Sequence, residues 1–145
     1  MKSVLLSLHS KWIEPIMLGR KVYEVRKRAP LCKPPFTVYI YCTRGGEEKY
    51  LPGIVGKRDS YKLNGNVCGE FICTRVIKMH PPYRDKINGT CLTAKDLCQY
   101  DGGAECLYFM EIENPIMYDT PKNLHDFGLD RAPMSWMYCE GLNNG

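Results

Sequence analysis

The sequence predicts a small α+β fold, a mixed β-barrel of five to six strands with two or three short helices. Strand-like runs separated by loops occupy most of the chain, and the helical segments are short. The regular alternation of strands and helices that is typical of a parallel α/β sheet is missing. The 145 residues, of which 44% are hydrophobic and 25% charged, match the size and composition of one soluble domain with its own core. We therefore expect residues 1–145 to form a single domain.

The first elements are expected in the order strand, helix, strand. The apolar run 4–8 is bounded by polar residues, which indicates a buried strand. Ser10 can cap the following helix, which begins late or bends at Pro15 and ends at Gly19. An alternating strand over 21–28 follows directly, so the helix and this strand meet at a sharp elbow.

The middle of the chain is expected to hold one clear strand and one long loop. Three prolines in 29–35 exclude regular structure, and the β-branched and aromatic run 36–43 is typical of a strand. The connection 44–66 contains five glycines and is long enough to be either functional or mobile. Its basic residues predict a flap near phosphate groups or, alternatively, an ordinary solvated loop. These residues are Lys49, Lys57, Arg58 and Lys62.

The second half is expected to contain three strands and two short helices. The predicted strands are 67–79, with a bulge at Gly69–Glu70, then 106–112 and 134–139. One helix begins with the capping pattern of Thr93 to Asp96 and ends at Gly102. The other is expected to begin at Thr120–Pro121 and to end at Gly128.

Charge is distributed unevenly along the chain. The first 62 residues contain 13 Lys and Arg against five Asp and Glu, whereas the remaining residues contain seven against 11. A basic first half favours a partner that carries phosphate. No run approaches the length of a membrane span or a signal peptide, so we expect no membrane association.

The eight cysteines have apolar neighbours and form no CxxC pair. This usage is typical of buried free thiols in a reducing compartment, and it predicts a cytoplasmic protein. The three histidines have no acid or thiol at ligand spacing. The sequence therefore predicts no metal and no cofactor.

The elbow between the first helix and its strand concentrates opposite charges. Residues two apart on a strand share a face, so Glu24 and Arg26 are expected to point the same way. Lys21 is expected on the opposite, core-facing side, with its amine reaching to the surface. A carboxylate roughly 7 Å from a guanidinium can accept from an amino or imino group while the guanidinium donates to a carbonyl or phosphate. This pair is suited to holding a nucleobase edge; the alternative is a surface ion pair worth less than about 1 kcal/mol.

The elbow run 19–26 resembles the signature of ASCH domains. The match continues in order through 38–43, 69–71 and 132–138, so it covers nearly the whole chain. The likeness is to a stand-alone ASCH protein of the kind often seen in phages and prophages. It implies a PUA-like β-barrel with a cleft and a role in binding RNA, a nucleotide or a modified nucleoside.

The residue pattern and the resemblance together lead us to expect roles for individual residues. Arg20 and Lys21 are expected to meet a phosphate or carbonyl oxygen, and Glu24 to accept from a base edge. Arg26 is expected to orient Glu24 or to donate to the ligand. Trp136 is expected either to stack on a base or to seal the barrel. The target is expected to be a single-stranded or exposed base, because a compact pocket cannot read a paired one.

A subset of small ASCH proteins are amidohydrolases that deacetylate 4-acetylcytidine. They use a Lys at the elbow, a Thr three residues later and a Glu from a later helix. Lys21 matches the lysine, whereas Glu24 stands at the threonine position and offers no hydroxyl nucleophile; Asp96 and Glu105 are candidates for the later acid. Lys21 and Glu24 are therefore catalytic residues only in a variant mechanism in which Glu24 activates water. A protein that binds a host protein is a third possibility.

Overall fold

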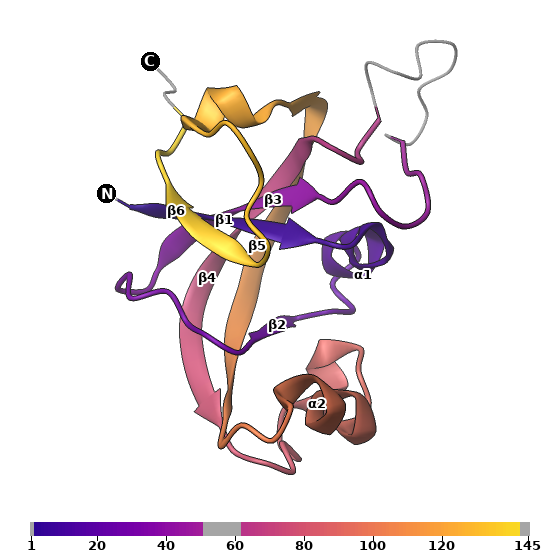
Figure 1. Cartoon of the computed structure of the whole chain (residues 1–145), viewed down its shortest axis with the longest axis vertical. Helices are drawn as coiled ribbons and strands as arrows, with labels where there is room; N and C mark the ends of the chain where they lie inside the picture. The colour runs from indigo at the N-terminus through magenta and orange to yellow at the C-terminus, as the bar shows by residue number, and fades with distance from the viewer. Residues whose placement is uncertain (1, 51–61, 143–145) are drawn as a thin grey trace.

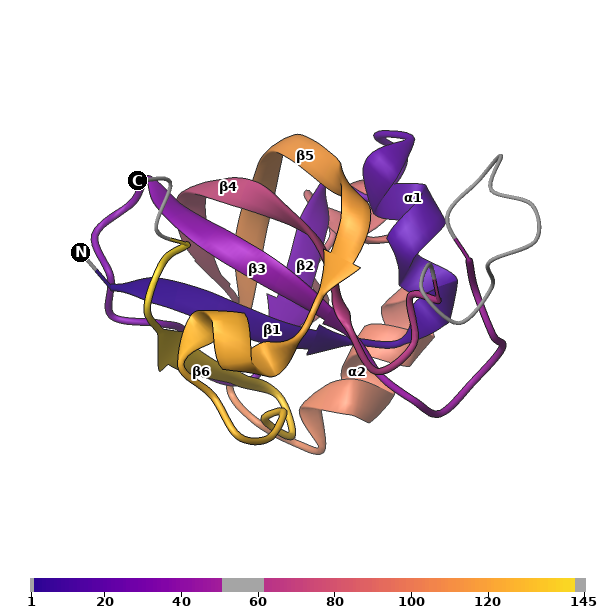
Figure 2. The ribbon, with the colours of Figure 1, turned by 90° about the horizontal axis from the view of Figure 1, so that it is seen from above.

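A six-stranded sheet forms the frame of the molecule, seen in the computed structural model, which describes residues 2–50 and 62–142. The strands lie in the order β2-β5-β4-β3-β1-β6; β1 and β3 are parallel, and the other pairs are antiparallel. The sheet curls around a core, as Figures 1 and 2 show. The strands are β1 (Ser3–Leu8), β2 (Tyr23–Arg26), β3 (Phe36–Cys42), β4 (Val67–Met79), β5 (Leu107–Lys122) and β6 (Trp136–Cys139).

Short helices cover the sheet at its sides. The α-helices are α1 (Ile13–Met17) and α2 (Ala94–Asp101), and the 3-10 helices are η1 (Ser10–Trp12), η3 (Ile87–Thr90) and η4 (Leu124–Phe127). Figure 1 shows β2 between α1 and α2 on one side of the molecule. None of the described helices is long and apolar enough to cross a membrane. The predicted small α+β barrel is confirmed.

The central strand β3 is buried on both of its faces. Val38 and Ile40 belong to the main core inside the curl. Tyr39 and Tyr41 face a second cluster, where the Tyr39 ring lies 4.7 Å from the ring of Phe127 in η4. A third cluster lies beneath α2 and includes Val25 of β2. Because α2 and β2 share this cluster, packing fixes one relative to the other.

The first helix begins late, as the proline predicts. η1 precedes α1, and Pro15 lies in the first turn of α1, where a missing amide donor costs little. Sequence reasoning placed the cap at Ser10, but the structure has His9 at this position, with its ring Nδ1 accepting from the amide of Lys11 at 3.2 Å.

The prediction for 120–128 was wrong at its start. Thr120 and Pro121 belong to β5, which continues to Lys122 and pairs there with Val67 of β4. The long β4–β5 pairing, which is interrupted by register shifts, outweighs the local helix-start signal. The short helix begins at Leu124 instead, capped by the side chain of Asn123.

The predicted basic loop 44–66 lies partly outside the described residues, since 51–61, with Lys57 and Arg58, are not described. In the described part, Asn64 accepts from the amide of Lys49 at 2.7 Å, which joins the two arms of the loop. Lys49 and Lys62 pair with glutamates of the same loop, at 3.4 and 3.0 Å.

Helix α2 begins with the predicted capping box. The Thr93 hydroxyl accepts from the amide of Asp96 at 3.0 Å, and the Asp96 carboxylate accepts from the amide of Thr93 at 2.9 Å. Hydrogen bonding from Thr93 to the Asp96 carboxylate, above all from the Thr93 amide, holds the pKa of Asp96 below its usual value.

Thr93→Ala is expected to lower the free energy of unfolding by about 1 kcal/mol, because the first turn of α2 loses the acceptor for an orphan amide. The urea midpoint, at unchanged m value, measures this loss. Thr93→Ser keeps the hydroxyl and is expected to retain most of the stability. Equal losses in both variants would contradict the capping explanation.

Candidate functional site

A pocket of about 300 Å³ lies beside β2, with residues from η1 on one wall and from α2 on another. Its charged lining residues are Lys21, Glu24, Arg26 and Asp96, and two aromatic side chains, Trp12 and Tyr100, also line it. The structure thus brings together Lys21, Glu24 and Arg26 from the elbow in one pocket.

The turn at the end of α1 delivers Lys21 to this pocket. Gly19 has a φ of +76°, which favours glycine, and the amides of Arg20 and Lys21 both donate to the carbonyl of Pro15, at 2.9 and 3.0 Å. Lys21 is only 2% exposed, so it does not reach to the surface as predicted. It precedes the first residue of β2, and the alternation of strand faces therefore does not decide its direction.

The Lys21 amine is buried and partly satisfied. Its Nζ donates to the carbonyl of Thr90 at 2.6 Å and lies 4.8 Å from the ring centroid of Trp12. Burial lowers the pKa of Lys21, and the nearby charge of Glu24 opposes this shift. The amine is therefore a stronger acid than an exposed lysine, while it keeps N–H groups for a ligand.

The carboxylate of Glu24 has a buried oxygen that accepts no hydrogen bond from the described residues. The residue is 6% exposed, and its Oε1 lies 3.5 Å from Nε of Arg26. Among the described residues, its Oε2 has no hydrogen-bond partner. An unsatisfied buried carboxylate oxygen is costly, so such an atom in a pocket indicates a place for an N–H donor from outside the chain.

Arg26 joins the two edges of the curled sheet. Its Nη2 donates to the carbonyl of Ser7 at 2.9 Å, and its Nη1 donates to Oγ of Ser135 at 3.0 Å. β2 lies at one edge of the strand order, whereas Ser135 precedes β6 at the other. We call this junction the seam. Because the guanidinium is engaged by the seam and by Glu24, its position favours orienting Glu24 over donating to a ligand.

Two residues predicted for the site lie elsewhere. Arg20 is exposed and is not among the described residues that line the pocket. Trp136 is 4% exposed; its Nε1 donates to the carbonyl of Arg28 at 2.9 Å, and the Arg28 guanidinium lies 3.9 Å from the ring centroid. Trp136 therefore seals the barrel, which is the alternative interpretation of this residue.

Sequence reasoning missed the two aromatic walls. Neither Trp12 nor Tyr100 was among the residues predicted for the site. Tyr100 follows Asp96 by four residues on α2, so the two share a helix face. The helical spacing from Asp96 is therefore the signal in the sequence that points to Tyr100. Glu105, the other acid considered, is not among the described lining residues.

The described residues contain no group of three or more His, Cys, Asp or Glu side chains placed to hold a metal ion. Besides Arg26 and Asp96, the pocket offers one buried amine, two aromatic rings and one carboxylate oxygen that has no partner among the described residues.

Comparison with known proteins defines the class of the fold. No family model and no curated protein sequence matches the chain. Solved structures do match: the ASCH protein of Zymomonas mobilis aligns with a TM-score of 0.71 and 18% identity over 94% of this chain and 86% of that chain. A tyrosine-to-phenylalanine variant of that protein aligns with a TM-score of 0.72 and 17% identity over 95% and 90% of the two chains. The chain therefore has the fold of an ASCH protein.

Proposed function

We propose that this chain is an ASCH-domain protein that binds RNA, a nucleotide or a modified nucleoside through a base held in the pocket beside β2. The observation that carries this proposal is the buried Oε2 of Glu24, which has no partner in the described part of the chain and lines the same pocket as the buried amine of Lys21. The ASCH fold supports it. A stand-alone phage or prophage type and a cytoplasmic location stay predictions from the sequence.

Four of the residues that line the pocket have roles in holding a base. Glu24 Oε2 accepts from an amino or imino N–H, and Lys21 Nζ donates to a carbonyl or phosphate oxygen. The rings of Trp12 and Tyr100 offer apolar contact to the planar base. A volume of about 300 Å³ lies at the lower end for small-molecule pockets, which favours one unpaired base.

Glu24→Gln and Lys21→Met are each expected to weaken ligand binding about tenfold or more, since each removes one charge-assisted hydrogen bond. Calorimetric titration with short single-stranded RNAs and with modified nucleosides measures the effect. Glu113→Gln and Lys122→Met make the same chemical changes outside the pocket and are expected to bind as wild type. Unchanged binding in both pocket variants, with folding verified by circular dichroism, would end the proposal.

The alternative is a small amidohydrolase acting on an acylated nucleoside, and the lowered pKa of Lys21 favours it. In this reaction Glu24 takes a proton from water, and the resulting hydroxide adds to the acyl carbon. The carbon–nitrogen bond then breaks while the Lys21 ammonium protonates the departing nitrogen. The proton on Glu24 returns to Lys21, and an acetylated base yields acetate and the free amine.

Incubation with 4-acetylcytidine tests this alternative. If the protein hydrolyses this nucleoside, acetate and cytidine are released. Glu24→Gln is expected to abolish turnover, because an amide is a poor base. Absence of product at high enzyme concentration, under conditions in which the nucleoside binds, would reject hydrolysis of this substrate and leave the binding function standing.

A further inference from the structure

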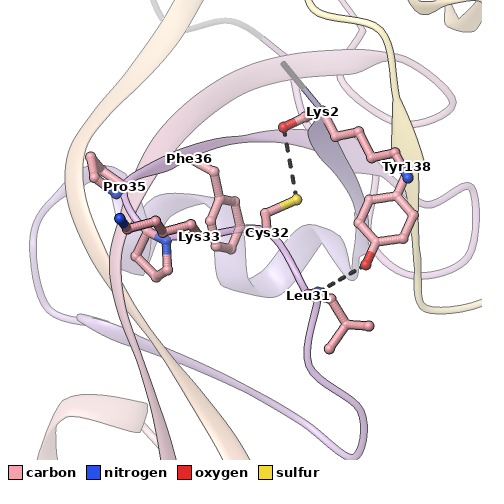
Figure 3. Close-up of a pocket in the computed structure, with 8 residues that line it drawn as sticks. Lys2, Leu31, Cys32, Lys33, Pro35, Phe36 and Tyr138 are labelled. Atoms are coloured by element: carbon pink, nitrogen blue, oxygen red, sulfur yellow. Dashed lines mark hydrogen bonds between the residues drawn. The ribbon is translucent and has the colours of Figure 1, made fainter.

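A second hollow, of about 670 Å³, lies beside the loop that follows β2 (Figure 3). Tyr138 of β6 and Phe36 of β3 line it, together with Lys2, Cys32 and Lys33. Its volume lies within the range of small-molecule sites, and its aromatic and apolar lining is typical of them. It does not share a lining residue with the pocket beside β2.

Two hydrogen bonds shape this hollow in advance of any ligand. The amide of Leu31 donates to the Tyr138 hydroxyl at 2.8 Å, and the Cys32 thiol donates to the carbonyl of Lys2 at 3.8 Å. Figure 3 shows both contacts, with the Tyr138 ring facing the hollow between Lys2 and Leu31. The loop is thereby tied to β6 and to the beginning of β1.

The charge of the second hollow has one sign. Its described lining residues include no Asp or Glu, and Lys2 and Lys33 are both exposed. The Lys2 amine lies 4.9 Å from the centroid of the Tyr138 ring. An aromatic surface flanked by two exposed lysines suits a ligand that combines a planar group with negative charge.

A basic path connects the two sites. The sequence from 25 to 46 contains no acidic residue. Within it, Lys27 and Arg28 are exposed, and the Lys27 amine lies 5.1 Å from the ring of Tyr100 at the first pocket. Ser135 contacts Arg26 at the first pocket, and Tyr138, three residues later, lines the second hollow. Three residues of strand span about 10 Å, so the two sites are neighbours along β6.

We propose that the ligand is a single strand of RNA that occupies both sites, an inference that rests on the proposed function of the first pocket. One base enters the pocket beside β2, and the backbone crosses Lys27 and Arg28. A second base packs against Tyr138, where phosphate groups contact Lys33 and Lys2. Spaced aromatic surfaces joined by a positively charged track are how proteins hold single strands.

The test is a series of oligouridylates from one to about seven nucleotides, titrated into the wild type and into Arg28→Ala/Lys33→Ala. We expect wild-type affinity to rise with length until both sites are filled. The double variant is expected to lose about tenfold in affinity for the longest oligomer and little for the mononucleotide. Its slope of log affinity against log salt is expected to fall by about 1.4, because two phosphate contacts are removed.

Arg84→Ala/Lys122→Ala is the matched control, since it removes one arginine and one lysine at positions that line neither hollow. Tyr138→Leu removes the ring and is expected to weaken binding of the longest oligomer at least about fivefold. Tyr138→Phe keeps the ring, loses only the hydrogen bond to Leu31, and is expected to retain most of that binding.

The two proposals fail in different ways. Equal affinity for all lengths, or equal behaviour of the double variant and its control, would overturn the two-site strand while the Glu24 and Lys21 variants still report on the first pocket. Absence of binding to any oligomer or nucleoside would overturn both. If this chain binds a protein partner through Lys33 and has no affinity for RNA, the inference is likewise overturned.

Discussion

Arg26→Met is expected to lower the free energy of unfolding by about 3–5 kcal/mol, the loss typical when one partner of a buried ion pair is removed. The change leaves the Glu24 carboxylate buried without its cation. It also leaves the Ser7 carbonyl and the Ser135 side chain without this donor. Since Arg26 lies on β2 and these two groups lie on β1 and just before β6, the change loosens the seam beside the pocket, and the variant is also expected to bind ligand more weakly.

Chemical unfolding at pH 7 measures the effect. Glu24→Gln added to Arg26→Met is expected to recover part of the loss, because a neutral amide is less costly to bury than an unpaired carboxylate. Arg84→Met is the matched control, an exposed arginine for which we expect little change. A loss below about 1 kcal/mol in Arg26→Met would show that the seam contributes no more than a surface ion pair.

Tyr83→Ala is expected to destabilise the fold by about 3–5 kcal/mol, the cost of removing a large buried aromatic side chain. Tyr83 is fully buried in the cluster beneath α2, where its ring stacks 6.0 Å from Phe109. Its hydroxyl donates to Asp101 Oδ2 at 2.7 Å, at the end of α2. Loss of this side chain is therefore expected to loosen the helix that carries Tyr100.

Tyr83→Phe separates the hydroxyl from the ring and is expected to cause a smaller loss than Tyr83→Ala. The hydroxyl of Tyr83 and the amide of Gly103 hold the pKa of Asp101 below the ordinary value of 3.8 for an aspartate. This group stabilises the fold above pH 3.8, and its contribution disappears as the pH falls through the lowered pKa. Tyr83→Phe is expected to flatten the decline of stability in acid. An unchanged pH dependence would contradict this role of the hydrogen bond.

Periodic signals in the sequence were sufficient for most of the sheet. The strand at 36–42 is rich in β-branched and aromatic residues because both of its faces are buried. One register shift of β4 lies between Val67 and Gly69, where the glycine interrupts the apolar pattern. The cap of α2 is encoded within four residues, from Thr93 to Asp96. Each of these features depends on neighbours in the chain, which is why the sequence predicts them.

Long-range contacts explain what the sequence could not predict. The partners of Arg26 are 19 and 109 residues away, and no local pattern links them. The burial of Lys21 depends on Thr90, 69 residues later, whose carbonyl satisfies the amine. Trp136 is covered by Arg28, which is 108 residues away in the sequence. In all three cases, residues that are distant in the sequence determine where a charged or amphipathic side chain lies.

The two edges of the curled sheet are joined by the side chain of Arg26. Among the described strands, β2 is paired with β5 and β6 with β1, so no backbone ladder joins the two edges. The structure can therefore open locally at the Arg26 contacts while the backbone pairing of the strands stays intact. A ligand that donates a hydrogen bond to Glu24 would stabilise the closed seam. Occupancy of the pocket is therefore expected to slow amide hydrogen exchange around Ser7 and Arg26.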